Sequence, residues 1–387
     1  MRLSPGNSDD VKTFSDHDTI SSSPVTRWDA RLGAMTDPCL RSIEVASIPR
    51  PFPEDPYIEL FYRALRAHGV VLAPPGPYTI PWLFQHHGQV QAFHLHWLHL
   101  FYDAPSRLAA SLRFLRFCAR LSVIKLAGFK LFWTAHNLQS HEKKHPLLDA
   151  LAARLMALVA DRVFVHGPTA AGVVADCLKR RDVVQLPHFA YVGYYPDETD
   201  RATARERLSL SSDEFVLLCF GKVRAYKGIE KLVAQFRAEA RPADRLLIVG
   251  RPETVEIEAE MRELASGDER ILLHLRFVPD DEAQTFFRAA DLVVSPYRSI
   301  LTSGAVAMAF TFGIPMVMPR LGSIPDVVNE EYGVLYEGDR IWPAIETLRA
   351  AAWPSLAGRV RSRGRELSWD KIAEVAARAF RETCDRT

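Results

Sequence analysis

Short apolar segments alternate with longer amphipathic segments along most of this 387-residue chain, and this alternation constrains its fold more than any other feature. The short segments predict buried strands, and the longer segments predict helices. Strands that alternate with helices of about 10–20 residues form βαβ units and parallel sheets. The sequence therefore predicts an α/β protein. The expected strands are 43–48, 70–73, 90–95, 130–134, 162–165 and 183–186, followed by 215–220, 245–249, 271–277, 292–295, 315–318 and 333–335.

The expected strands form two sets, separated by a proline-containing and acidic segment at 187–201 that has the composition of a linker. We expect a first Rossmann-like domain at 42–195, a second at 205–365, and a final amphipathic helix within 366–387. Residues 1–41 are rich in Ser, Asp and Thr and lack the apolar core of a signal peptide. We expect them to form a flexible N-terminal extension.

Composition limits the class of protein further. The net charge of +1 does not favour a nucleic-acid partner, which selects for a strongly basic surface. The five cysteines are scattered and form no C-x-x-C pair, which predicts reduced thiols and a cytoplasmic location. No apolar run reaches the length of about 18 residues that a membrane-spanning helix needs.

A glycine turn with two cations follows the first strand of the second set. Gly221 ends the apolar run 215–220, and Arg224 and Lys227 lie on the turn before the next helix. Backbone N–H groups and the helix dipole favour an anion at such a position, and the cations add fixed charge. The segment therefore predicts a diphosphate site, although a solvated basic turn has the same composition.

A second strand end in this half is also suited to an anion. Thr302, Ser303 and Gly304 precede a helix expected to begin near residue 305, and small polar residues allow backbone amides to approach a phosphate. A helix cap without a ligand is the simpler alternative. Two such strand ends in one α/β pattern favour a shared ligand, because ligands of these sheets gather at the carboxyl ends of the strands.

These segments, with the Gly-Ile-Pro-Met-Val sequence that begins at Gly313, resemble the donor-binding domain of GT-B glycosyltransferases. In the first half, 93–99 (FHLHWLH) and 133–142 (WTAHNLQSHE) are similar to segments of bacterial exopolysaccharide-assembly transferases of the β-mannosyl- and glucuronosyltransferase type. The resemblance implies two Rossmann-like domains whose parallel sheets face across a cleft, with a C-terminal helix that crosses back to the first domain. It also implies hexose transfer from a GDP- or UDP-linked sugar, such as GDP-mannose, to a glycan acceptor, lipid-linked in many such enzymes.

The resemblance also assigns the donor-binding residues. They are Gly221, Arg224, Lys227, Arg251, Tyr297, Thr302, Ser303, Gly304 and Asp326. Cations and helix amides can stabilise a departing diphosphate by themselves. We therefore expect neither a metal nor a cofactor beyond the nucleotide-sugar substrate.

One departure from the family concerns the stereochemistry of transfer. Many retaining GT-B enzymes carry a pair of glutamates in this region, and Ile300 and Met308 occupy the corresponding positions here. An inverting reaction becomes plausible, and it requires a base that accepts the proton of the acceptor hydroxyl.

Histidines concentrate in the first half and supply candidates for that base. Ten of the 13 histidines lie between His86 and His188. We place His136 and Glu142 first, because His136 follows the strand 130–134 at the edge where the cleft is expected, and His96 and Asp103 after them. A structural role is the alternative for each histidine, and a zinc site is disfavoured by the lack of ligand spacing.

The segment 106–130 predicts contact with a membrane surface. Arg113, Arg116 and Arg120 recur at helical spacing, and the segment contains no acidic residue. A basic amphipathic helix suits the anionic inner face of the cell membrane. An ordinary domain helix with solvated arginines is the alternative.

Other activities also fit a donor-binding fold. A catalytically inactive subunit that binds a nucleotide sugar or a partner protein is one, because the paired glutamates are missing. A GT-B-fold epimerase is another, and it would act on the donor without an acceptor. A phosphorylase would need a lysine that carries pyridoxal phosphate, usually in a much longer chain.

Overall fold

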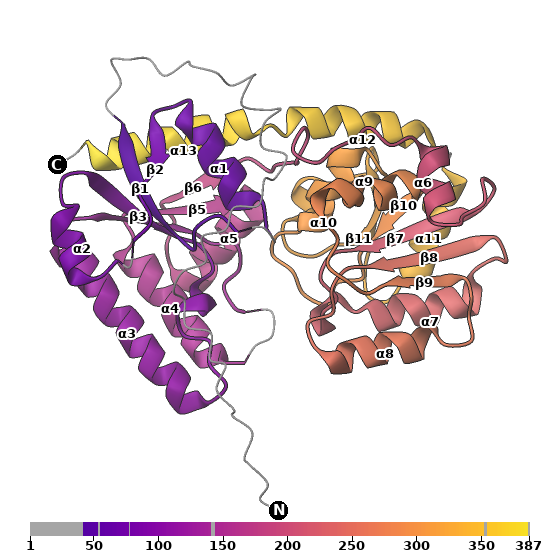
Figure 1. Cartoon of the computed structure of the whole chain (residues 1–387), viewed down its shortest axis with the longest axis horizontal. Helices are drawn as coiled ribbons and strands as arrows, with labels where there is room; N and C mark the ends of the chain where they lie inside the picture. Colours follow the sequence, from indigo (N-terminus) through magenta and orange to yellow (C-terminus); the bar gives the residue numbers. More distant parts are fainter. Residues whose placement is uncertain (1–41, 53–54, 77, 141–143, 352–353, 386–387) are drawn as a thin grey trace, which may run out of the picture. The chain divides into compact units, whose positions relative to one another are not determined.

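The computed structural model describes residues 42–385 apart from 53–54, 77, 141–143 and 352–353. It contains two six-stranded sheets, with strand orders β2-β1-β3-β4-β5-β6 and β12-β11-β10-β7-β8-β9. All strand pairs in both sheets are parallel. This confirms the predicted α/β fold with two parallel sheets (Figure 1). The N-terminal extension expected at 1–41 lies outside the described residues.

The strands lie close to the ranges expected from the sequence. They are β1 (Ile43–Ile48), β2 (Val70–Leu72), β3 (Val90–Leu95), β4 (Lys130–Thr134), β5 (Arg162–His166), β6 (Val183–Leu186), β7 (Phe215–Phe220), β8 (Asp244–Val249), β9 (Ile271–His274), β10 (Leu292–Val294), β11 (Met316–Pro319) and β12 (Gly333–Tyr336). The first six fall within the domain predicted at 42–195 and the last six within that predicted at 205–365. The exact domain boundaries stay a prediction.

Helices connect the strands and follow the second sheet. They are α1 (Tyr57–Arg66), α2 (Ile80–Gln85), α3 (Arg107–Leu126), α4 (Pro146–Val159), α5 (Gly167–Leu178), α6 (Arg201–Arg207), α7 (Ile229–Glu239), α8 (Val255–Ala265), α9 (Asp280–Ala289), α10 (Gly304–Phe312), α11 (Ile341–Ala350), α12 (Pro354–Glu366) and α13 (Trp369–Cys384). Short 3₁₀ turns occur at η2 (Leu98–Phe101), η3 (Ala225–Lys227) and η4 (Ile324–Asp326).

Both faces of the first sheet are buried, because successive side chains of a strand point to opposite faces. In β4, Leu131 and Trp133 belong to the core that α2, α3, α4 and α5 cover. Phe132 belongs to the opposite core, which α1 and α13 cover. Figure 1 shows α3 and α4 on one side of this sheet and α13 on the other. Burial on both faces explains why the strands read as continuous apolar runs.

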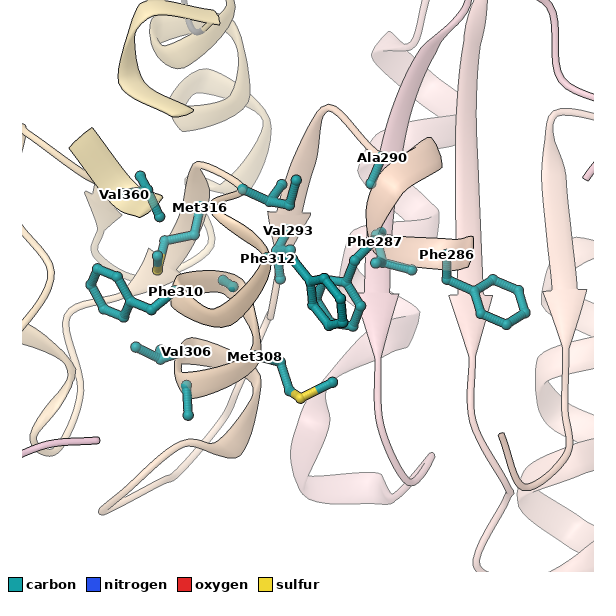
Figure 2. Packing of buried hydrophobic residues seen from close by; sticks show 14 of the residues in the cluster. Phe286, Phe287, Ala290, Val293, Val306, Met308, Phe310, Phe312, Met316 and Val360 are labelled. Atoms are coloured by element: carbon teal, nitrogen blue, oxygen red, sulfur yellow. The ribbon is translucent and has the colours of Figure 1, made fainter. Parts of the chain in front are cut away.

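The second sheet has the same construction. Helices α7, α8 and α11 cover one face, and α9, α10 and α12 cover the other. Figure 2 shows part of the second core, in which Phe287 of α9 stacks on Phe312 of α10 with ring centroids 4.7 Å apart. Helix α12, which was not predicted as a separate element, brings Val360 into this core.

The final helix crosses to the first half, as predicted. Helix α13 packs against α1, β1, β5 and β6. Its Phe380 is fully buried and lies 4.2 Å, centroid to centroid, from Phe132 and 5.6 Å from Phe164. The end of the chain therefore completes the core of the first sheet.

We predict that Phe380→Ala lowers the free energy of unfolding by about 3–5 kcal/mol, because it leaves a cavity between α13 and β4. Chemical denaturation followed by fluorescence measures this change. The control is Arg378→Ala, which removes an exposed side chain from the same helix and is expected to change stability by less than about 0.5 kcal/mol. Equal stability of the two variants would show that α13 is not part of the first core.

Candidate functional site

A cavity of about 320 Å³ lies where the carboxyl ends of strands from both sheets meet. Parallel strands direct all their following loops to one edge, which is where ligands of such sheets bind. The first half contributes the loops after β1, β3 and β4 and the last residue of β5, and the segment after β6 also lines the cavity. The second half contributes loops after β7, β10 and β11. Its polar and aromatic lining residues include Asp55, Tyr57, Trp97, His136, Asn137, His166, Lys222, Arg224, Tyr226, Lys227, Tyr297, Thr302 and Ser303, and the glycines Gly221 and Gly304 also line it.

The turn after β7 brings a buried cation to the cavity. Gly221 has φ +104°, and a Cβ there would lie 2.8 Å from Nζ of Lys227, so the turn requires glycine. Nζ of Lys227 donates a hydrogen bond to the Phe220 carbonyl at 3.0 Å. Burial lowers the pKa of Lys227 to about 8. Arg224 lines the same cavity, with Nε 3.6 Å from a carboxylate oxygen of Glu253.

The start of α10 forms the facing wall. The Ser303 side chain caps the helix by accepting from the Val306 amide at 3.3 Å, and its Oγ lies 3.0 Å from the Tyr297 hydroxyl. Oγ1 of Thr302 donates to the backbone carbonyl of His136 at 3.3 Å. The structure therefore brings together the two strand ends that the sequence singled out, and it joins one of them to the first half.

Two residues predicted to bind the donor are not among the residues that line this cavity. Arg251 is exposed after β8, and it is not among the residues that line the cavity. Asp326 accepts hydrogen bonds from the amide and the hydroxyl of Thr169, at 3.1 and 2.6 Å, at the start of α5. The position of Asp326 fits a link between the two halves, because a carboxylate is stabilised at a helix N-terminus.

The histidine candidates form a stack that runs inward from the cavity. The ring of His136 stacks on Trp97 at 4.6 Å, and its Nε2 lies 3.1 Å from Nδ1 of the fully buried His96. Burial lowers the pKa of both histidines well below the usual value, and the nearby histidines lower it further. Both imidazoles are therefore neutral near pH 7 and are weak proton acceptors.

The other two candidates for the base are placed differently. Glu142 lies outside the described residues. Asp103 does not line the cavity, and it pairs with Lys144 at 3.2 Å on an exposed part of the surface. Of the described candidates, His136 alone lines the cavity, and the assignment of the base among the four stays a prediction.

Asp55 is a cavity residue that the sequence analysis missed. Its carboxylate accepts a hydrogen bond from the Tyr57 amide at 3.0 Å and lines the cavity beside Lys222. Burial raises the pKa of Asp55 to about 6, although that hydrogen bond and the charge of Lys222 both lower it. The available signal was its position, since an aspartate that follows the first strand lies at the same edge as the other site residues.

Ile300 and Met308 stand where the resemblance to retaining enzymes would place a pair of glutamates. Ile300 and Met308 both line the cavity. Across the part of the chain that the structure describes, no three His, Cys, Asp or Glu side chains are grouped in a way that could hold a metal ion.

Comparison with known sequences agrees with this arrangement. Residues 214–349 match the family described as glycosyl transferases group 1. The chain is 27% identical over 303 residues to a GDP-mannose:glycolipid 4-beta-D-mannosyltransferase of Xanthomonas campestris pv. campestris. This match covers 75% of this chain and 79% of that protein. A D-inositol 3-phosphate glycosyltransferase of Xylanimonas cellulosilytica is 30% identical over 202 residues, or 49% of this chain and 48% of that protein.

Solved structures show the same fold at low sequence identity. Sucrose-phosphate synthase from Thermosynechococcus elongatus aligns with a TM-score of 0.68 at 19% identity, over 89% of this chain and 100% of that one. Anabaena Alr3699/HepE in complex with UDP aligns with a TM-score of 0.66 at 15% identity, over 88% of this chain and 100% of that one. The two sheets, the site at their facing strand ends and these matches lead to one conclusion: the chain is a glycosyltransferase of the GT-B fold, with a group 1 domain at residues 214–349.

Proposed function

We propose that this glycosyltransferase moves a hexose from GDP-mannose, or a closely related nucleotide-diphosphate sugar, to a lipid-linked glycan during polysaccharide synthesis. The observation that carries the proposal is the convergence of Lys227, Arg224 and the start of α10 on one cavity. The printed activity of the Xanthomonas relative, a GDP-mannose:glycolipid mannosyltransferase, supports the choice of donor and acceptor.

In the proposed reaction, the bond between the anomeric carbon and the donor diphosphate breaks as the acceptor oxygen bonds to that carbon. Lys227 and Arg224 stabilise the charge that develops on the departing diphosphate, without a metal or a cofactor. Asp55 accepts the proton of the acceptor hydroxyl, because its carboxylate lines the cavity and has a pKa closer to neutrality than an ordinary aspartate. The apolar side chains of Ile300 and Met308 support an inverting outcome.

The donor assignment predicts that GDP-mannose raises the melting temperature of the protein, because a ligand of the folded state stabilises it. Lys227→Met is expected to weaken binding about 10- to 150-fold, the effect of losing a charge-assisted contact of roughly 1.5–3 kcal/mol. Wild-type affinity should fall as the pH rises above about 8, where Lys227 loses its proton, and the variant should lack this dependence.

A control variant and a panel of four nucleotide sugars complete this donor test. Lys231→Gln alters an exposed lysine of α7 that pairs with Asp339, and it should bind the donor as the wild type does. The absence of a thermal shift with GDP-mannose, UDP-glucose, UDP-galactose and UDP-glucuronate alike would refute the proposed function.

The role of Asp55 predicts a pH profile. The value of kcat/KM should rise with pH through about 6, because the carboxylate must lose its proton before it can act as a base. Asp55→Asn should reduce kcat about 10²- to 10⁴-fold, remove this rise, and leave GDP-mannose binding intact. Asp103→Asn serves as the control outside the cavity. A profile in Asp55→Asn that keeps the rise near pH 6 would assign the base to another residue.

The outer sides of α3 and α4 support attachment to a membrane surface. We define the leucine face as Leu108, Leu112 and Leu115 of α3 with Leu147, Leu151 and Leu158 of α4, all exposed. Both helices bury their opposite sides against the same face of the first sheet, so these leucines point outward together. Arg113, Arg116 and Arg120 are exposed on α3. None of the described helices is long and apolar enough to span a bilayer.

We therefore propose peripheral attachment to the cytoplasmic face of the cell membrane through the leucine face and the adjoining arginines. Flotation with anionic liposomes should show binding at low salt and release at high salt, since each cation near the surface contributes about 1 kcal/mol. Reversing Arg113, Arg116 and Arg120 to Glu should abolish binding. Reversing the exposed Arg241, Arg262 and Arg378 should not. Binding that survives the first set of reversals would contradict this attachment.

A further inference from the structure

A second cavity, of about 390 Å³, lies between α4, α5 and the loop that follows β10. Asn137 and Ile300 line both this groove and the reaction cavity, so the two spaces adjoin. The first half supplies most of its wall, and Ser299, Ile300 and Leu301 supply the part from the second half.

The wall next to Asn137 is held by buried hydrogen bonds. One carboxylate oxygen of Asp149 accepts from the amide and the hydroxyl of Ser140, at 3.0 and 2.8 Å. The other accepts from the Tyr102 hydroxyl at 2.7 Å. Asp149 is almost fully buried in α4, so these contacts fix the end of the segment 137–140 against that helix. The groove therefore has a preformed wall on the side of the reaction cavity.

The groove is lined mainly by apolar residues, together with polar residues at Asn137, Gln139, Ser140 and Ser299 and a single basic residue. Its apolar lining comprises Leu138, Ala150, Ala153, Val173, Leu178, Ile300 and Leu301. Arg154 is the one Lys or Arg among the lining residues, and its side chain is exposed. Within the described part of the chain, Arg154 has no ion-pair partner, so its charge is available to a ligand.

One rim of the groove lies on the stripe of α4 that carries part of the leucine face. Leu147, Leu151, Arg154 and Leu158 recur at spacings of four, three and four residues, which places them in one stripe on α4. Arg154 thus belongs both to the rim of the groove and to the stripe that carries the exposed leucines. A molecule bound at the α4 part of the leucine face would therefore lie beside Arg154 at this rim.

We infer that this groove binds the acceptor through a phosphate-bearing, partly apolar segment that links its sugar to its lipid. Arg154 pairs with the phosphate, the apolar walls receive the adjoining hydrocarbon, and the sugar extends past Asn137 into the reaction cavity. The inference rests on the proposed function, and it adds the anionic character of the acceptor and the path by which it enters.

Cys177 provides a direct test, because its exposed thiol lines the groove and it is the one exposed cysteine among those described. The protein is saturated with GDP, so that the reaction cavity is occupied, and is then labelled with a maleimide in the presence of farnesyl diphosphate, inorganic diphosphate or farnesol. Mass spectrometry of the peptide that contains Cys177 measures the labelling rate. We expect farnesyl diphosphate to slow labelling at least tenfold and the other two probes to slow it less than twofold.

Substitutions identify the basic group. Arg154→Gln should raise the farnesyl diphosphate concentration needed for half-protection at least tenfold. Arg181→Gln, which alters an exposed arginine beyond α5, should leave it unchanged. Unprotected labelling with farnesyl diphosphate, equal protection by inorganic diphosphate or farnesol, or protection that survives Arg154→Gln would each overturn the inference.

A second variant separates this inference from the proposed function. Cys177→Trp fills the groove without entering the reaction cavity, so it should raise the KM for a glycolipid acceptor at least tenfold and leave the GDP-mannose thermal shift unchanged. An unchanged acceptor KM beside a normal donor shift would overturn the groove and leave the proposed function standing. Loss of the donor shift in the wild type would instead refute the proposed function.

Discussion

Parallel pairing of every described strand is the constraint on which the rest of the structure depends. In a parallel sheet, each strand must be followed by a crossover helix, and all the strand-to-helix loops leave from one edge. Two such edges contribute to one cavity here, so residues as distant in sequence as Asp55 and Lys227 line the same space. The position of the site follows from the direction of the strands, and its chemistry follows from the loops.

Burial gives the groups of this cavity different protonation states. The imidazoles of His96 and His136 are kept neutral, because burial lowers their pKa. The same desolvation raises the pKa of Asp55 to about 6 and lowers that of Lys227 to about 8. Near pH 7 the cavity therefore holds a carboxylate able to accept a proton and a lysine able to neutralise an anion. These are the two groups that an inverting glycosyl transfer requires.

The sequence was sufficient to predict the fold, and it singled out two strand ends that the structure brings to one cavity. Apolar runs such as 215–220 indicate burial on both faces of a sheet, and a glycine turn with Lys227 predicts an anion site, because both signals are local. The positions of Asp326 and Arg251 outside the cavity lining could not be predicted in this way. Asp326 contacts Thr169 in the other half, and only the tertiary structure shows that contact. Asp55 was missed because a single aspartate in a proline-rich loop has no distinctive local pattern.

The central claim is that Lys227 and the start of α10 hold the donor diphosphate. A crystal structure of the protein with GDP tests this claim most directly. The account predicts a diphosphate within hydrogen-bonding distance of Nζ of Lys227 and of the first backbone amides of α10. A diphosphate bound elsewhere, for example at the exposed Arg251, would contradict it.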